Sequence, residues 1–168
     1  TGKWDNKGAG ALYGNAGIYP LNWSLVMGLD VRDKSVRELD MCRLGSILLG
    51  DEEDLKGGPP VKALLIQNTN PAVVCPDQNK VHEGFRRDDL FMVVHEQFMT
   101  ETAEFADIVL PATMFLEHDD MYTGGGHVYF SVTKPVIEAP GECRSNHDLM
   151  CALADRLGLD HRGFKMSA

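Results

Sequence analysis

The segment VKALLIQNTNP, Val61–Pro71, decides the fold of this chain. It begins with a short run of leucine and β-branched residues and ends in the turn-forming residues Asn68–Pro71. A short apolar run that is bounded by turn residues is typical of a strand buried on both faces. The segment therefore predicts a buried strand over Val61–Gln67, followed directly by a polar loop.

Two further apolar runs repeat this pattern. LFMVVH at Leu90–His95 and DIVL at Asp107–Leu110 each predict a strand. Helical stretches are expected before them, at Asp77–Arg87 and Thr102–Phe105. Strands that alternate with helices through short loops are typical of a parallel sheet with crossover helices. We predict an α/β fold of three layers, with a mostly parallel sheet and Rossmann-like or flavodoxin-like winding.

The parts on either side of this centre are less regular. Thr1–Pro20 is an irregular, glycine-rich N-terminal segment, and short helices are expected at Leu21–Leu29 and Ser35–Leu49. We expect residues 1–60 to pack on the core and residues 61–168 to form an α/β dinucleotide-binding domain, together one compact unit.

The C-terminal part predicts one extended segment and one helix. The extended segment is HVYFSVT at His127–Thr133. Ser145 is a good N-cap with Asp148 three residues later, and Gly158 is a good residue to end the helix.

Charge and cysteine content exclude several classes of partner. The chain of 168 residues has a net charge of -9, from 25 acidic and 16 basic residues. Nucleic acid and anionic membrane surfaces are therefore not expected as partners, since both attract clustered Lys and Arg. The chain has no apolar run of the roughly 20 residues needed to span a bilayer. Its four cysteines form no CxxC pair, so neither a zinc nor an iron–sulfur site is expected from this chain.

The sequence also bears on compartment and completeness. Free thiols in a reducing compartment favour a cytoplasmic protein, and a periplasmic location is the alternative if a longer parent carries an export signal. The opening Thr1-Gly2-Lys3 lacks an initiator Met and a signal peptide, so we expect the chain to begin within a longer protein.

Polar residues gather where the predicted strands end. Ligands of open parallel sheets bind at these carboxyl ends, where loops and the first turns of helices meet. The candidate binding residues all lie at such positions: Asn68, Thr69, Asn70, Pro71, Glu96, Thr100 and Thr102. The pattern predicts a nucleotide site of neutral donors and one acid. The alternative is that these residues only cap turns and helices, as Asn and Thr often do.

A second group of polar residues is the run Glu117–Asp120, with His95 and Glu96 as possible neighbours. Carboxylates and imidazoles bind metals and transfer protons, so a small metallohydrolase that uses His95, Glu117 and Asp119 is an alternative function. Adjacent residues of one loop rarely converge on a single ion, and a solvated acidic loop is the preferred interpretation. The sequence therefore assigns no catalytic residue and no metal ligand.

Beyond these patterns, two stretches resemble a known family. They are ALLIQNTNP at Ala63–Pro71 and LFMVVHEQFMTETAEFADIVLPATMFLEHDD at Leu90–Asp120. They are similar to molybdopterin oxidoreductases of the dimethyl sulfoxide reductase and formate dehydrogenase type. The specific part is E-x-F-x-T-x-T-A-x-x-A-D-I-V-L-P at Glu96–Pro111, and the similarity extends through Arg144–Gly158.

The resemblance implies a molybdenum or tungsten ion held in a longer parent by two molybdopterin guanine dinucleotides. This chain resembles the later of the two α/β domains that hold them. Asn68 and Asn70 would lie near the dinucleotide, Glu96 at its guanine–ribose end and Thr100 at a phosphate. The chain would position the cofactor and be inactive alone. Its partners would be the remaining domains of the parent and an electron-transfer partner of unknown identity.

The chain departs from the family pattern in three respects. It lacks the cysteine cluster of a 4Fe–4S centre, which is therefore expected only elsewhere in the parent. It has no recognisable Cys, Ser or Asp ligand for the metal. It reads Tyr122–His127 where relatives often carry Asn and Arg. A structural paralogue that keeps the fold but has lost the pterin, as in a subunit of a respiratory complex, is the first alternative, ahead of the metallohydrolase.

Overall fold

The computed structural model describes residues 22, 24, 27–29, 31–123 and 129–165. The predicted glycine-rich segment Thr1–Pro20 and most of the predicted helix Leu21–Leu29 lie outside these residues, so the proposed division of the chain at residue 60 stays a prediction.

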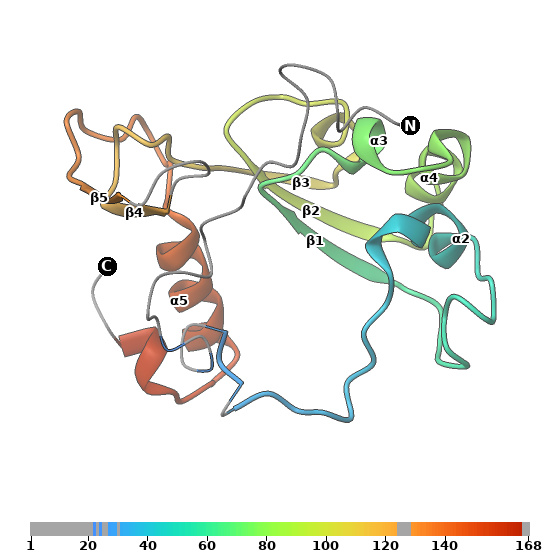
Figure 1. The fold of residues 1–168 in the computed structure, drawn as a ribbon. Coiled ribbons are helices and arrows are strands. Elements are labelled where there is room, and N and C mark those ends of the chain that lie inside the picture. Colours follow the sequence, from blue (N-terminus) through green and yellow to red (C-terminus); the bar gives the residue numbers. More distant parts are fainter. Residues whose placement is uncertain (1–21, 23, 25–26, 30, 124–128, 166–168) are drawn as a thin grey trace, which may run out of the picture.

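A sheet of three parallel strands forms the centre of the described part (Figure 1). The strands are β1 (Ala63–Gln67), β2 (Phe91–Glu96) and β3 (Ile108–Pro111), in the order β1-β2-β3. The order is sequential, as in one half of a Rossmann sheet, with no reversal among the described strands. The predicted α/β fold with a parallel sheet is confirmed.

The register of the strands decides which side chains share a face. Leu65 of β1 pairs with Val93 of β2, which in turn pairs with Ile108 of β3. Because side chains alternate along a strand, the next row of residues, which includes Ile66 and Val94, points to the opposite face.

One face of the sheet is covered by helices. The helices α3 (Pro71–Val74) and α4 (Gln78–Phe85), which connect β1 to β2, lie there with α2 (Leu44–Leu48) (Figure 1). The side chains that form the core on this face are at most 6% exposed: Leu48, Ile66, Ala72, Val81, Phe85, Leu90, Met92, Val94 and Ala103. We call this side of the sheet the covered face.

Two glycines allow α2 and α4 to approach closely. A Cβ atom at Gly84 would lie 2.5 Å from Cβ of Leu48, and one at Gly45 would lie 2.7 Å from Cβ of Lys80. Contacts between such atoms are never this short, so a larger residue would push the two helices apart.

The helix predicted over Ser35–Leu49 is shorter in the structure. Only a 3-10 turn, η2 (Met41–Arg43), and α2 are helical. The prediction was wrong for the first residues because side chains bind the backbone there. Oδ1 of Asp33 accepts the amide N–H of Ser35 at 2.8 Å, and Asp40 caps η2 by accepting the amide of Cys42 at 2.9 Å. Such local hydrogen bonds compete with the helix.

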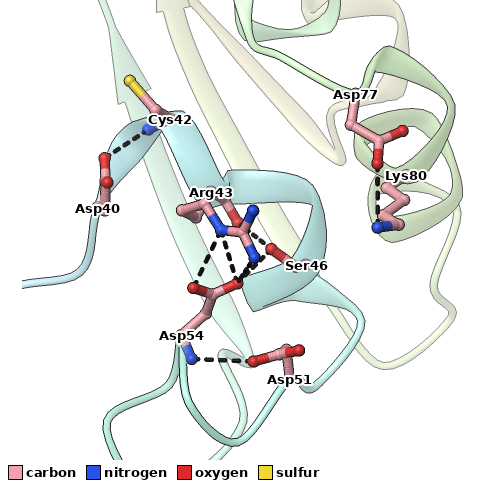
Figure 2. A network of polar contacts seen from close by, with 8 residues as sticks. All are labelled: Asp40, Cys42, Arg43, Ser46, Asp51, Asp54, Asp77 and Lys80. Carbon is pink, nitrogen blue, oxygen red and sulfur yellow. Dashed lines mark hydrogen bonds and ion pairs between the residues drawn. The ribbon is translucent and has the colours of Figure 1, made fainter.

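An ion pair fixes α2 to the connection that follows it. Nε of Arg43 donates to both carboxylate oxygens of Asp54, at 3.1 and 3.0 Å, and the hydroxyl of Ser46 donates to the same carboxylate (Figure 2). The hydrogen bonds from Arg43 and Ser46 lower the pKa of Asp54 below its usual value.

Among the described residues, the other face of the sheet is covered only in part, and we call it the open face. The helix α5 (Asn146–Arg156) lies over it, and an apolar pocket of about 370 Å³ is lined by both. The residues that line this pocket are Ala63, Leu64, Leu65, Phe91, Val93 and Leu110 of the strands, with Leu149 and Leu153 of α5. This helix begins as predicted, because Oγ of Ser145 accepts the amide of Asp148 at 3.1 Å.

Three short elements complete the described part. They are η3 (Ala103–Phe105), the hairpin of β4 (Asp120–Thr123) and β5 (Phe130–Thr133), and η4 (Arg162–Lys165). Of these, η3 was predicted as a helical turn. Neither β4 nor α3 was predicted, because each is only four residues long and too short to show a periodic pattern. No helix among the described residues has the length and hydrophobicity needed to cross a membrane.

Candidate functional site

A polar cleft of about 670 Å³ opens at the carboxyl ends of the three strands. Four parts of the chain line it, namely the loops after β1 and β2, the segment that runs from β3 into β4, and the residues just before and at the start of α5. Because the loops follow parallel strands, their polar residues meet at one edge of the sheet although they are distant in sequence.

The loop after β1 presents two side chains that have no partner. Asn68 takes a left-handed backbone conformation, with φ of 55°, which Asn tolerates better than most residues. This conformation turns the chain sharply at the end of the strand. The side chains of Asn68 and Thr69 are exposed in the cleft and make no hydrogen bond with any described residue.

Asn70 also lines the cleft, but its side chain ties two loops together. Its Oδ1 accepts the hydroxyl of Thr102 at 2.6 Å and the amide of Thr102 at 3.2 Å, and its Nδ2 donates to Glu101 at 2.8 Å. The hydrogen bond from Asn70 lowers the pKa of Glu101. The hydroxyl of Thr102 in turn accepts the amide of Ala72 at 3.0 Å. Asn70 therefore joins the loop after β1 to the loop after β2.

The loop after β2 contributes one carboxylate. Oε1 of Glu96 accepts the amide of Gln97 at 2.7 Å, while Oε2 has no hydrogen-bond partner among the described residues. The side chain of Gln97 donates to the carbonyl of Thr113 at 2.8 Å and so joins this loop to the one after β3. Glu96 is thus fixed, and its second carboxylate oxygen can accept a hydrogen bond from a ligand.

The structure separates the predicted binding residues into two groups. Asn68, Thr69, Asn70 and Glu96 line the cleft, whereas Pro71, Thr100 and Thr102 do not. Pro71 is buried at the start of α3, and Thr102 is fully buried with its hydroxyl bonded on both sides. The hydroxyl of Thr100 accepts the amide of Ala103 at 3.3 Å, as in a helix cap. In the structure the second group thus caps and joins turns.

His95 lies under the cleft and is 1% exposed. Its Nδ1 is 3.3 Å from the side-chain nitrogen of Gln67, and its Nε2 is 3.2 Å from the carbonyl oxygen of Arg144. The carbonyl of Arg144 can only accept, so Nε2 of His95 donates to it. His95 therefore supports the floor of the cleft, and neither nitrogen is free to bind a metal.

The run Glu117–Asp120 is partly exposed, as a solvated loop would be, but it also forms part of the cleft wall. His118, Asp119 and Asp120 line the cleft wall, and Nδ1 of His118 is 2.7 Å from the hydroxyl of Thr113. Burial raises the pKa of the neighbouring Tyr122, and its hydrogen bond with Asp120 adds to the rise.

The structure also gives no support to the metallohydrolase alternative. Glu117 uses a carboxylate oxygen to accept the amide of Met114 at 2.9 Å. In the ranges that the structure describes, no three His, Cys, Asp or Glu side chains are grouped so that they could hold a metal ion.

Sequence reasoning did not select the fourth wall of the cleft. It consists of Arg144–Asp148, just before and at the start of α5. The backbone of Arg144 pairs with Ala112, which directly follows β3, as one more parallel strand position. The available signal was a basic residue next to the N-cap Ser145, and it is weak without knowledge of this pairing.

Taken together, these groups are suited to binding. The cleft offers free amide and hydroxyl groups, one half-free carboxylate on Glu96 and the guanidinium of Arg144. Such a set can bond a polar ligand that carries both hydrogen-bond donors and a negative charge.

Comparison with known proteins agrees with the fold. The family model described as molybdopterin oxidoreductase matches residues 42–156. The probable oxidoreductase YoaE of Bacillus subtilis is 44% identical over 99% of this chain, which spans 24% of that relative. The periplasmic nitrate reductase of Desulfovibrio desulfuricans is 37% identical over 62% of this chain and 14% of its own length.

A solved structure shares the architecture as well. Acetylene hydratase from Pelobacter acetylenicus superposes with a TM-score of 0.60 and 28% identity, over 74% of this chain and 16% of the hydratase. The chain therefore spans about a quarter or less of the relatives named here. With a family model that covers most of its length, the chain belongs to the molybdopterin oxidoreductase family.

Proposed function

We propose that the cleft at the carboxyl edge of the sheet holds the guanine nucleotide end of a molybdopterin guanine dinucleotide. One observation carries the proposal: Asn68 and Glu96, at the ends of two neighbouring strands, line a single cleft with free hydrogen-bonding atoms. The family of the chain supplies the class of cofactor, molybdopterin with molybdenum. The guanine dinucleotide form and the tungsten alternative are part of the proposal.

The chemistry of the cleft residues fits a nucleotide. Guanine and ribose present N–H and O–H donors, and Oε2 of Glu96 is free to accept them. The amide of Asn68 can donate and accept, as a base edge requires. The volume of about 670 Å³ falls within the range of roughly 300–1,000 Å³ that is usual for small-molecule sites.

The role of this chain is to bind and orient. When bound, the cofactor supplies the metal at which oxygen atoms or electrons are transferred in the whole protein. Asn70 and Thr102 keep the loop of Asn68 in position, and Gln97 does the same for Glu96. We propose that the isolated chain is catalytically silent. Activity would need the remaining domains of a longer protein and an electron-transfer partner, and any 4Fe–4S centre would lie outside this chain.

Titration of the chain with GMP, followed by amide chemical shifts, tests the proposal. We expect shifts at residues 68–70 and 96–97, and an affinity that is roughly tenfold weaker in Glu96→Gln, because a charge-assisted hydrogen bond is lost. The matched control is Glu83→Gln, an exposed glutamate on α4 outside the cleft. A wild-type chain whose amides near Asn68 and Glu96 do not respond to GMP would refute the proposal.

A second measurement separates the enzyme from a structural paralogue. We expect the purified longer protein to contain molybdenum or tungsten and a pterin in stoichiometric amounts. A folded protein that contains neither would favour the non-catalytic alternative, in which the cleft persists without a cofactor.

A further inference from the structure

The cleft contains one permanent cation among several acids. Its lining includes the carboxylates Glu96, Asp119, Asp120 and Asp148, and Arg144 is the single Lys or Arg among the described residues that line it. An excess of carboxylates repels an anionic ligand unless the acids are paired and the cation is free. The partners of these charged groups therefore decide which part of a ligand each wall can bind.

Three of the four acids are committed to other groups. Asp119 pairs with Nζ of Lys134 at 3.1 Å, and Asp120 lies 3.8 Å from Nε2 of His118 and accepts the amide of Met121. Asp148 accepts the hydroxyl of Ser145 at 2.8 Å. Glu96 has no cationic partner, and its Oε2 is used by no described residue.

Arg144 combines a fixed backbone with an uncommitted side chain. Its amide donates to the carbonyl of Pro111 at 3.1 Å, and its carbonyl accepts the amide of Thr113 at 3.1 Å and Nε2 of His95 at 3.2 Å. The guanidinium is exposed and makes no hydrogen bond or ion pair with any described residue. The guanidinium is therefore available to a ligand, while the backbone that carries it is fixed beside the sheet.

The sheet places the two free charged groups on opposite walls of the cleft. The amide of Ala112 donates to the carbonyl of Glu96, and Arg144 pairs with Ala112 on the other side. Glu96 and Arg144 are thus two strand spacings apart, or about 10 Å at the backbone. A nucleoside phosphate can bridge them, because its donor-bearing base and ribose lie at one end and its phosphate at the other.

We propose that Arg144 binds the phosphate of the nucleotide while Glu96 binds the nucleoside, so that the two residues set the direction in which the ligand lies. The inference rests on the proposed function and adds a specificity-determining residue to it. A guanidinium forms bidentate hydrogen bonds with phosphate oxygens, and Arg144 is the one Lys or Arg among the described residues that line the cleft.

The test compares guanosine with GDP, without divalent metal, by titration of the 168-residue chain. The wild type should bind GDP more tightly than guanosine, and this preference should decline at high sodium chloride because salt screens the charge. Arg144→Gln should lower the affinity for GDP roughly tenfold and leave the affinity for guanosine unchanged. Arg144→Lys should recover part of the preference, since it keeps the charge but not the bidentate geometry. Arg156→Gln, which removes the same charge from α5 outside the cleft, is the matched control.

Each outcome separates this inference from the proposed function. If the wild type binds neither ligand, the proposed function fails and the inference fails with it. A second outcome is that the wild type binds both ligands while Arg144→Gln lowers both affinities equally, or that its preference for GDP does not change with salt concentration. Either result overturns only the role of Arg144. The salt series needs no variant, so the inference stays testable even if Arg144→Gln fails to fold.

Discussion

The two faces of the sheet are built from alternate residues of the same strands, yet they differ sharply in burial. On the covered face, Met92 and Val94 are each 1% exposed beneath α2 and α4. On the open face, Leu65 is 41% and Phe91 is 50% exposed. Both faces of the strands carry large apolar residues, so the difference arises from what packs against them.

This difference indicates which face contributes more to the free energy of folding. Strands of a parallel sheet are usually buried on both faces. The helix α5 brings Leu149 and Leu153 toward the open face, but Leu153 itself remains 38% exposed. We infer that the covered face contributes most of the free energy of folding, and that the open face can accept further apolar surface.

The largest expected effect contrasts two neighbouring residues of β2. Met92→Ala should lower the free energy of unfolding by about 2–5 kcal/mol, because it leaves a cavity in a closed core. Phe91→Ala removes a larger side chain that is 50% exposed, and should cost only about 1 kcal/mol. Denaturant unfolding of both variants measures the difference. Equal losses would show that the open face is as well packed as the covered one.

A second prediction concerns the close approach of α2 and α4 on the covered face. Gly84→Ala should lower the free energy of unfolding by roughly 1–3 kcal/mol, with a value near the upper end, because the new methyl group would overlap with Leu48. Glu83→Ala, next to it on the exposed side of α4, is the control and should change stability by less than about 0.5 kcal/mol. A Gly84→Ala chain as stable as the control would mean that the two helices can separate without cost.

A third prediction tests the link between the covered face and the cleft. Thr102→Val keeps the shape of the side chain but removes the hydroxyl that joins Asn70 to the amide of Ala72. The variant should lose roughly 1–2 kcal/mol, because a buried donor is left without a partner. It should also speed hydrogen exchange at Ala72 and Thr102. Unchanged exchange would show that the loops are held by other contacts.

The sequence predicted the strands well because each one carries its own local signal. Runs such as LFMVVH at Leu90–His95 mark a strand without knowledge of its neighbours. Parallel pairing then brings the ends of β1 and β2 together, so Asn68 and Glu96 could be placed in one site from topology alone. The same apolar runs do not say which face is covered, because that depends on where the helices pack.

The missed part of the site depends on long-range pairing. Arg144 reaches the cleft because its backbone extends the sheet beside Ala112, and the carbonyl of Arg144 is held by His95. No local pattern around Arg144 encodes either contact. The structural role of Thr102 could not be predicted for the same reason. A threonine near the start of a helix gives the same sequence pattern whether it caps a turn or binds a ligand.

The smallest expected effect is a pH dependence that arises at the edge of the covered face. Arg43 and Ser46 lower the pKa of Asp54 below its usual 3.8, so the folded chain favours the charged carboxylate (Figure 2). This stabilisation is complete above the pKa of the unfolded chain and is lost as the pH falls through the lower folded value. Asp54→Asn should therefore flatten the decline of unfolding free energy between neutral pH and about pH 3. Arg43→Gln should flatten it as well, and the double variant should add little, because both changes remove one interaction. A wild-type decline that persists in Asp54→Asn would assign the acid sensitivity to other carboxylates, of which Asp89, paired with Arg87 and Lys62, is the next to test.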